Sequence, residues 1–172
     1  MASRISEAPG KEFVITRVFD APRDLVWKVW TDVDHLKHWW GPKGFKMLFC
    51  TLDLRPGGIF HYGMQAPNGA EMWGKWTFRE IVPPQRLTIV ISFSDKAGGM
   101  TRHPFVPDWP QEMLGTTTFE EQGAKTLLTT RTIALNPTET ERKAFETGFD
   151  GMKQGFKGTW DQLEAYLAKT KG

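Results

Sequence analysis

The end of the chain carries the pattern that most constrains its fold. Between residues 138 and 168, large apolar side chains recur every three or four residues, and they are Phe145, Phe149, Met152, Phe156, Trp160, Leu163 and Leu167. This spacing places all of them on one stripe of an α-helix. Thr138 and Glu141 match a capping box at its start, although Asn136-Pro137 offers a competing start. A helix of roughly 45 Å, at about 1.5 Å per residue, requires a large concave partner for its aromatic face.

The same helix contains four glycines on a second face. Gly148, Gly151, Gly155 and Gly158 lie about 120° around the helix from the apolar stripe. A glycine in a helix interior costs about 1 kcal/mol relative to alanine. The four glycines therefore indicate either close approach of a neighbouring backbone or room left for a ligand. An exposed face that tolerates glycine is an equal alternative.

Length and composition predict a single domain. The 172 residues carry a formal net charge of +2, and no basic stripe marks a nucleic-acid binder. The single cysteine, Cys50, excludes an internal disulfide and fits a reducing compartment. The polar first ten residues lack the apolar core of a signal peptide, and no run reaches the ~18 apolar residues of a membrane span. We expect a flexible segment over residues 1–10, one domain over residues 11–170, and a cytoplasmic monomer or homodimer.

Seven strands and two short helices are predicted ahead of the long helix. The first strand, residues 11–19, is followed by helices that begin near the N-caps Asp20 and Asp32 and end before Gly41. The other strands span residues 45–54, 59–65, 71–82, 86–94, 113–120 and 125–134. Short connections between strands predict antiparallel hairpins. The expected fold is therefore α+β, a curved seven-stranded antiparallel sheet around the long C-terminal helix.

One connection is much longer than the others. Residues 94–111 contain a Gly-Gly pair and three prolines, with Phe105 and Trp109 among them. Loops of this length in compact domains are usually functional or mobile, and two large aromatic side chains favour burial. We interpret the segment as a flap near a cavity mouth, with an inert surface loop as the alternative.

The candidate binding residues are aromatic and methionine side chains. Along residues 59–65, Phe60, Tyr62 and Met64 share one face, and His61 lies on the other. Eight tryptophans and twelve phenylalanines fit either a thick core or an aromatic-lined cavity. We expect the ligand-binding residues to be Trp40, Phe60, Tyr62, Met72, Trp76, Phe78, Phe93, Met113, Phe145, Phe149, Met152 and Phe156.

Two further positions are ambiguous. Trp73 falls on the polar face of its strand, which predicts either a bulge or partial exposure. In residues 125–134, either face can point inward. If the inward face is the one with Thr130 and Thr132, two hydroxyls lie in an apolar interior and could orient a ligand.

Polar residues give no recognisable catalytic or metal-binding pattern. The sequence has no phosphate-binding glycine loop and no serine elbow, so we expect no cofactor and no catalytic residue. His35 and His38 lack an obvious third ligand for a metal, and Cys50 fits a packed thiol. The weak candidates for an enzymatic site are Arg131, His103 and Glu71.

Five motifs occur in an order that is specific to a known family. They are FDAPR at 19–23, WWGP at 39–42, RPGG at 55–58, EIVPPQRL at 80–87, and WP at 109–110 before a T-x-T-F strand. Over residues 11–168 the chain resembles the activator of heat-shock-protein ATPase homologue family, of the START-like (SRPBCC) superfamily, in its single-domain bacterial type. The resemblance implies a helix-grip fold with a cavity between sheet and helix.

Three functions are compatible with these observations. The leading expectation is a binder of a hydrophobic or aromatic small molecule, lipid-like or polycyclic, held between sheet and terminal helix. The resemblance alone implies the second, a co-chaperone in the stress response that acts on a heat-shock chaperone ATPase. The third, a cyclase or hydrolase that uses the same cavity, is less expected than a non-enzymatic binder.

Overall fold

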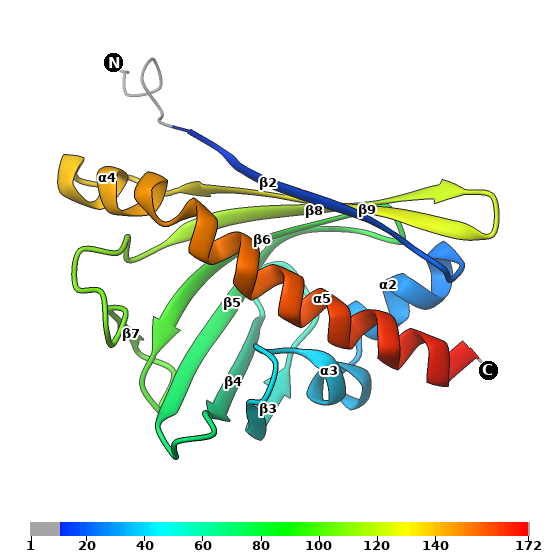
Figure 1. The fold of residues 1–172 in the computed structure, drawn as a ribbon, viewed down its shortest axis with the longest axis horizontal. Coiled ribbons are helices and arrows are strands. Elements are labelled where there is room, and N and C mark those ends of the chain that lie inside the picture. Colours follow the sequence, from blue (N-terminus) through cyan, green and yellow to red (C-terminus); the bar gives the residue numbers. More distant parts are fainter. Residues whose placement is uncertain (1–10, 172) are drawn as a thin grey trace.

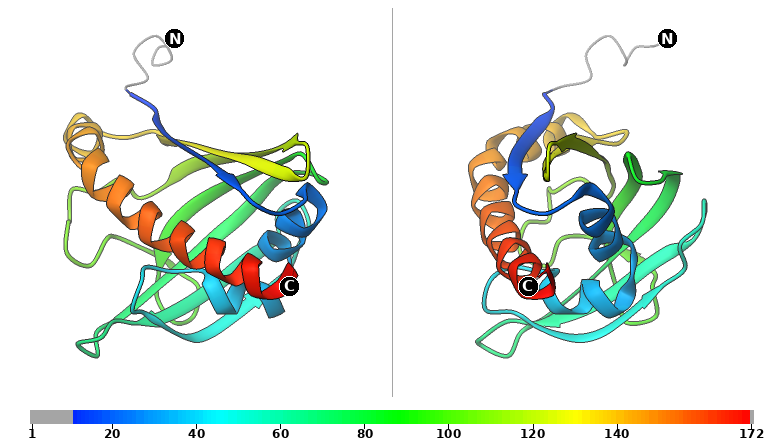
Figure 2. Two further views of the ribbon diagram at one scale, coloured as in Figure 1. Left: turned by 45° about the vertical axis from the view of Figure 1, so that its right-hand side comes forward. Right: turned by 90° about the vertical axis from the view of Figure 1, so that its right-hand side faces the viewer.

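The computed structural model describes residues 11–171. It contains a curved antiparallel sheet with a long helix along its concave side (Figure 1). The predicted flexible segment, residues 1–10, lies outside the described residues. Figure 2 shows from two further sides that α5 runs along the sheet and that α2 and α3 lie near its C-terminal end. The predicted α+β helix-grip arrangement is confirmed.

The sheet contains the seven predicted strands and one short extra strand. The strands are β2 (Phe13–Phe19), β3 (Lys46–Leu52), β4 (Ile59–Gln65), β5 (Glu71–Val82), β6 (Arg86–Ser94), β7 (Met100–Thr101), β8 (Met113–Gln122) and β9 (Lys125–Ala134). Within the described residues their order is β2-β9-β8-β6-β5-β4-β3, with β7 paired to β6. All pairings are antiparallel, as the short hairpin connections predict.

Two short helices follow β2, as predicted. They are α2 (Arg23–Thr31) and α3 (Val33–Trp39), and the Asp32 carboxylate caps α3 by accepting a hydrogen bond from the amide of Asp34 at 2.9 Å. The predicted cap of α2 at Asp20 is wrong. The cap position falls on Pro22, which makes no side-chain cap and pre-sets the backbone for the first turn.

The terminal helix is divided, which corrects the prediction of one uninterrupted rod. It consists of α4 (Glu139–Thr147) and α5 (Phe149–Lys171), and Figure 1 shows the change of direction between them. Gly148 stands at the break, where its poor helix propensity weakens the helix. The capping box is confirmed, because Thr138 and Glu141 exchange hydrogen bonds of 3.0 and 3.1 Å.

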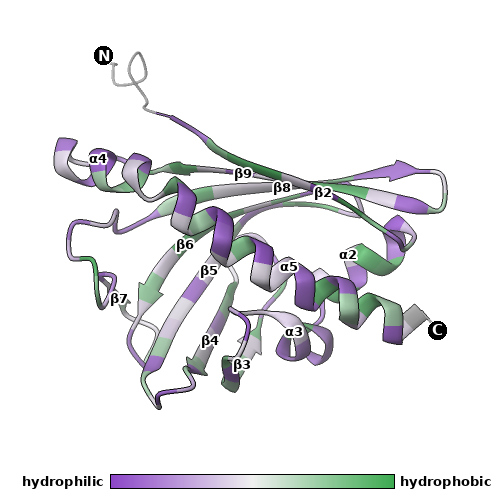
Figure 3. Cartoon of the chain, in the orientation of Figure 1, coloured by the Kyte–Doolittle hydropathy of each residue, from purple (hydrophilic) through white to green (hydrophobic). Residues whose placement is uncertain are grey.

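The core lies between the concave face of the sheet, α2, α3 and the C-terminal half of α5. Trp160, Leu163 and Leu167 of α5 are at most 2 % exposed, so this half of the helix seals the core. Along the strands and α5, hydrophobic and hydrophilic residues alternate in bands (Figure 3). The predicted inward parity of β4 and β5 holds, since Phe60, Trp76 and other side chains of the same parity are buried.

Candidate functional site

A pocket of about 240 Å³ lies between the sheet and α5. We call it the sheet–helix pocket, and its lining residues are Trp40, Gly41, Pro42, Tyr62, Met64, Met72, Trp73, Phe93, Met152, Gly155, Phe156 and Thr159. All twelve are uncharged, and the aromatic and sulfur-containing side chains dominate. Such a surface suits a small apolar molecule, with polar contacts at few points.

The turn after α3 is held against α5, and this contact shapes one end of the pocket. The backbone carbonyl of Gly41 accepts hydrogen bonds from the Thr159 hydroxyl at 3.0 Å and from the Gln162 amide at 2.7 Å. Gly41 has a φ of +116°, and the sulfur of Met64 occupies the place of a Cβ there. Only glycine fits this position, which explains the glycine of the WWGP motif.

Packed aromatic rings hold the pocket wall in place. The Trp40 ring meets the Trp76 ring edge-on with centroids 4.8 Å apart, and it meets Tyr62 at 5.8 Å. Tyr62 in turn stacks on Phe60 at 5.1 Å. Offset and edge-to-face aromatic contacts of this kind favour one arrangement of the rings. The wall is therefore formed before any ligand arrives.

Tyr62 is the main polar side chain of the pocket. It is 8 % exposed, and burial raises the pKa of its hydroxyl to about 12, an effect that a polar interaction with Trp40 partly opposes. The indole nitrogen of Trp40 makes no hydrogen bond of acceptable geometry within residues 11–171. On the neighbouring strand, a Cβ at Gly74 would lie 2.7 Å from the Tyr62 hydroxyl, so this glycine leaves room for the group.

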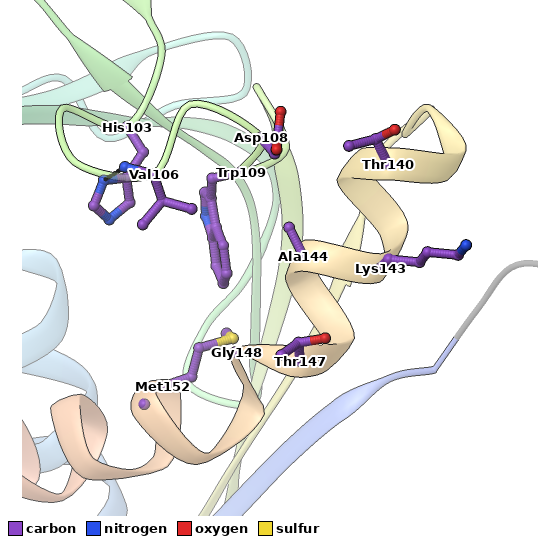
Figure 4. Close-up of a pocket in the computed structure, with 11 residues that line it drawn as sticks. His103, Val106, Asp108, Trp109, Thr140, Lys143, Ala144, Thr147, Gly148 and Met152 are labelled. Carbon is purple, nitrogen blue, oxygen red and sulfur yellow. Dashed lines mark hydrogen bonds between the residues drawn. The ribbon is translucent and has the colours of Figure 1, made fainter.

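A second pocket, of about 690 Å³, lies between the long loop and the start of the terminal helix (Figure 4). The segment predicted as a flap, residues 94–111, contains the short strand β7, so we use the name flap for residues 102–112 only. We call this space the flap pocket, and it is lined by His103, Val106, Asp108, Trp109, Thr140, Lys143, Ala144, Thr147, Gly148, Gly151 and Met152. In Figure 4 the Trp109 ring hangs from the flap toward the helix, whereas Lys143 extends to the other side of the helix. Met152 lines both pockets, so the two spaces adjoin.

Arg102 fastens the flap to α4. Its guanidinium donates hydrogen bonds to the carbonyls of Pro107 (3.1 Å) and Trp109 (3.4 Å) and to the Glu141 carboxylate (3.0 Å). The Glu141 side chain is 10 % exposed, and it also caps α4. One arginine thus connects the flap backbone with the start of the helix.

His103 orders the first turn of the flap. Its Nδ1 accepts hydrogen bonds from the amides of Phe105 (3.0 Å) and Val106 (3.2 Å), which leaves the ring proton on Nε2. Burial lowers the pKa of His103, so the neutral form prevails at pH 7. The ring also packs on Phe93, a residue of the sheet–helix pocket, at 4.6 Å.

The comparisons with known proteins agree with this architecture. A family model described as "Activator of Hsp90 ATPase homolog 1-like protein" matches residues 20–168. The chain belongs to this family. Its membership was predicted from the five motifs, and that prediction is confirmed. No curated protein matches the chain.

Solved structures of several bacterial proteins share the fold over almost the whole chain. A protein from Nitrosomonas europaea is 28% identical, with a TM-score of 0.73 over 93% of this chain and 96% of that chain. One from Arthrobacter aurescens is 27% identical, with a TM-score of 0.75 over 97% of this chain and 90% of that chain. A Mycobacterium smegmatis protein at 24% identity (TM-score 0.72, 91% and 90% covered) shares the fold.

The twelve predicted binding residues fall into two groups. Six line the sheet–helix pocket: Trp40, Tyr62, Met72, Phe93, Met152 and Phe156. The other six lie in packed clusters: Phe60, Trp76 and Phe78 in the main core, and Met113, Phe145 and Phe149 in a smaller cluster under the flap end of the helix. Strand parity identifies inward side chains but does not separate those that touch other side chains from those that border open space.

Several pocket residues were not predicted from the sequence. Met64 shares its face with Tyr62, and Thr159 lies one turn from Phe156 on α5. The positions of both residues in the sequence therefore place them beside predicted binding residues. Gly155 belongs to the glycine face, and a Cβ there would meet nothing within 4 Å. The interpretation of the glycines as room for a ligand therefore fits Gly155, whereas Gly148 packs closely against Trp109.

The ambiguous strand, β9, turns its threonine face inward. Thr130 and Thr132 are buried, and the Thr130 hydroxyl bonds that of Thr117 at 2.9 Å. The Thr132 hydroxyl is buried without a partner within residues 11–171. Trp73 is half-buried beside Phe49 at 5.7 Å, in agreement with the prediction of partial exposure.

The weak enzymatic candidates do not converge. Arg131 is exposed and pairs with Glu12 at 3.1 Å. Glu71 is exposed and accepts a hydrogen bond from Trp73 at 3.0 Å, while His103 lies in the flap. His35 bonds the Tyr166 hydroxyl at 2.7 Å, and His38 stacks on the same ring, so both histidines have structural contacts.

Residues 11–171 contain no cluster of three or more side chains suited to a metal ion. In the same part of the chain, no helix is both long and apolar enough to cross a membrane.

Proposed function

We propose that this protein binds a small hydrophobic molecule, lipid-like or aromatic, in the sheet–helix pocket. The observation that carries the proposal is an uncharged pocket of about 240 Å³, with Trp40 and Tyr62 on the sheet side and Met152 and Phe156 on α5. A dry cavity of about 150 Å³ holds one benzene ring in other proteins. The pocket therefore suits a molecule of about two rings or a short branched chain.

The physical driving force is burial of apolar surface. A two-ring molecule that loses about 200 Å² of apolar surface gains roughly 5 kcal/mol at ~25 cal/mol per Å², before the loss of its translational freedom. Because the aromatic wall is already packed, little side-chain order has to be created on binding. Since 5 kcal/mol corresponds to a dissociation constant of about 0.2 mM, we expect weak binding of simple two-ring compounds, at about that value or above it.

Two glycines of α5 provide a matched test. Gly155 lines the sheet–helix pocket and Gly151 lines the flap pocket one turn away, and a Cβ at either position meets nothing within 4 Å. Leucine at 155 fills much of the proposed site, whereas leucine at 151 leaves it open. We expect Gly155→Leu to weaken binding of 2-ethylnaphthalene at least tenfold in calorimetric titrations, and Gly151→Leu to change it less than twofold. Equal binding by both variants and the wild type contradicts the proposal.

The family description supplies a second candidate, an action on the Hsp90 ATPase. The match over residues 20–168 is the observation that favours it. Addition of the protein to a bacterial homologue of that chaperone tests it: a saturable rise in the rate of ATP hydrolysis supports it, and an unchanged rate removes it. A cytoplasmic location is part of both proposals.

A further inference from the structure

The Tyr62 hydroxyl in the sheet–helix pocket makes no hydrogen bond of acceptable geometry within residues 11–171. The Tyr62 side chain is more than nine-tenths buried, and its hydroxyl lies near the indole nitrogen of Trp40. Within residues 11–171 that nitrogen is buried and has no hydrogen-bond partner. An indole N–H can only donate, and a buried donor without an acceptor destabilises the free protein. Because that nitrogen has no accessible surface, a ligand in the pocket can reach the Tyr62 hydroxyl but not the indole N–H.

The other unpartnered indoles differ from Trp40 in their surroundings. The nitrogens of Trp30, Trp76 and Trp160 are also buried without partners, but these side chains are at most 2 % exposed in the closed core. Trp40 alone among the four is a lining residue of the pocket. A ligand in the pocket can therefore reach the neighbourhood of Trp40, whereas packed side chains surround the other three.

The position of the Tyr62 hydroxyl is built into the sheet. Tyr62 on β4 pairs with Gly74 on β5, where a Cβ would lie 2.7 Å from the hydroxyl oxygen. Glycine inside a strand weakens the strand, and it often marks a place where another group needs the space. The stack on Phe60 at 5.1 Å fixes the phenol ring from the other side.

The remaining pocket atoms define the charge of the ligand. All twelve lining residues are uncharged, and the Thr159 hydroxyl and the Trp73 indole already donate to Gly41 and Glu71. An ionised ligand would lose its hydration without gaining a counter-ion. A carbonyl oxygen is a neutral acceptor, so it can take the hydrogen bond of the Tyr62 hydroxyl without bringing a charge into the pocket.

We propose that the sheet–helix pocket selects neutral apolar molecules with one carbonyl-type oxygen, which accepts a hydrogen bond from the Tyr62 hydroxyl. The proposal rests on the proposed function, since it assigns a ligand class to the same pocket. Because burial raises the pKa of Tyr62 to about 12, its hydroxyl keeps its proton at all physiological pH values.

The test compares two probes of nearly equal size, 2-acetylnaphthalene and 2-ethylnaphthalene. The full chain is expected to bind the ketone about tenfold more tightly, the effect of one neutral hydrogen bond of ~1.4 kcal/mol. Tyr62→Phe is expected to remove that preference, because it lowers the affinity for the ketone about tenfold more than the affinity for 2-ethylnaphthalene.

The outcomes separate this inference from the proposed function. Equal binding of both probes to the wild type, or a preference that survives in Tyr62→Phe, overturns the inference and leaves the pocket as a binding site. Failure of both probes to bind overturns both. A second measurement does not depend on a variant: the carbonyl stretch of bound 13C-labelled 2-acetylnaphthalene is expected at lower wavenumber than in hexane. An unshifted band also overturns the inference.

Discussion

The Trp109 ring lies directly against Gly148, the residue between α4 and α5. A Cβ at Gly148 would be 2.7 Å from Cζ3 of that ring, which is closer than real Cβ contacts come. The same ring packs on Phe145 at 5.6 Å. The flap therefore contacts the terminal helix at the residue where the helix is divided.

This contact predicts opposite effects of alanine at two neighbouring glycines. Gly148→Ala is expected to lower the free energy of unfolding by about 1–3 kcal/mol, because the methyl group displaces Trp109. Gly151→Ala meets nothing within 4 Å and is expected to raise it by about 0.5–1 kcal/mol through helix propensity. Urea denaturation measures both. Equal stabilisation by the two substitutions contradicts the seating of Trp109 on Gly148.

We expect the ion pair between Arg102 and Glu141 to hold the flap against α4. Arg102→Ala removes three hydrogen bonds and is expected to cost about 1–2 kcal/mol and to speed proteolysis within residues 102–112. Arg55→Ala, which breaks an ion pair on the exposed surface with Asp53, is the control and should stay within about 0.5 kcal/mol of the wild type. An unchanged cleavage rate in Arg102→Ala would show that the flap is held by other contacts.

His103 predicts a loss of stability in mild acid. Burial lowers its pKa in the folded state, so the unfolded chain binds the proton more readily. Stability from this group is present above the unfolded pKa of about 6.5 and is lost as the pH falls through the lower folded pKa. Protonation also removes the acceptor of the Phe105 and Val106 amides.

The measurement is the free energy of unfolding at pH 7 and pH 5, in the wild type and in His103→Gln. We expect the wild type to lose stability between these values and the variant to lose less. Hydrogen exchange at Phe105 and Val106 should rise over the same range. Identical pH dependence in the two proteins contradicts the assigned role of His103.

We expect Tyr62 to ionise at a higher pH than an exposed tyrosine. The chain has two tyrosines, so Tyr166→Phe leaves Tyr62 as the one phenol that titrates. Its folded pKa of about 12 exceeds the ordinary value near 10, so the stability from this group is present below pH 10 and is lost as the pH rises toward 12. Absorbance at 295 nm follows tyrosinate. A midpoint near pH 10 in the folded protein would place Tyr62 in water and not in the pocket.

The sequence predicted the fold better than it predicted the site. The period of the terminal helix and the alternation in β4 and β5 depend on local geometry, and both appear in the structure as expected. Gly148 is a weak helix former by its sequence, but its contact with Trp109, which is distant in the chain, could not be predicted from a local pattern. Trp76 is buried in the core and does not line the pocket. The alternation along its strand predicts an inward side chain in either case, so it could not distinguish the two positions.

Methionine methyl resonances offer the most direct test of the central claim, that the sheet–helix pocket binds a small apolar molecule. Met64, Met72 and Met152 line the pocket, whereas Met100 is 46% exposed on β7. In a titration of 13C-methyl-methionine protein with 2-ethylnaphthalene, we predict saturable shifts of the three pocket methyl groups and an unchanged Met100 signal. Shifts absent at the probe's solubility limit, or equal at all methionines, would contradict the account.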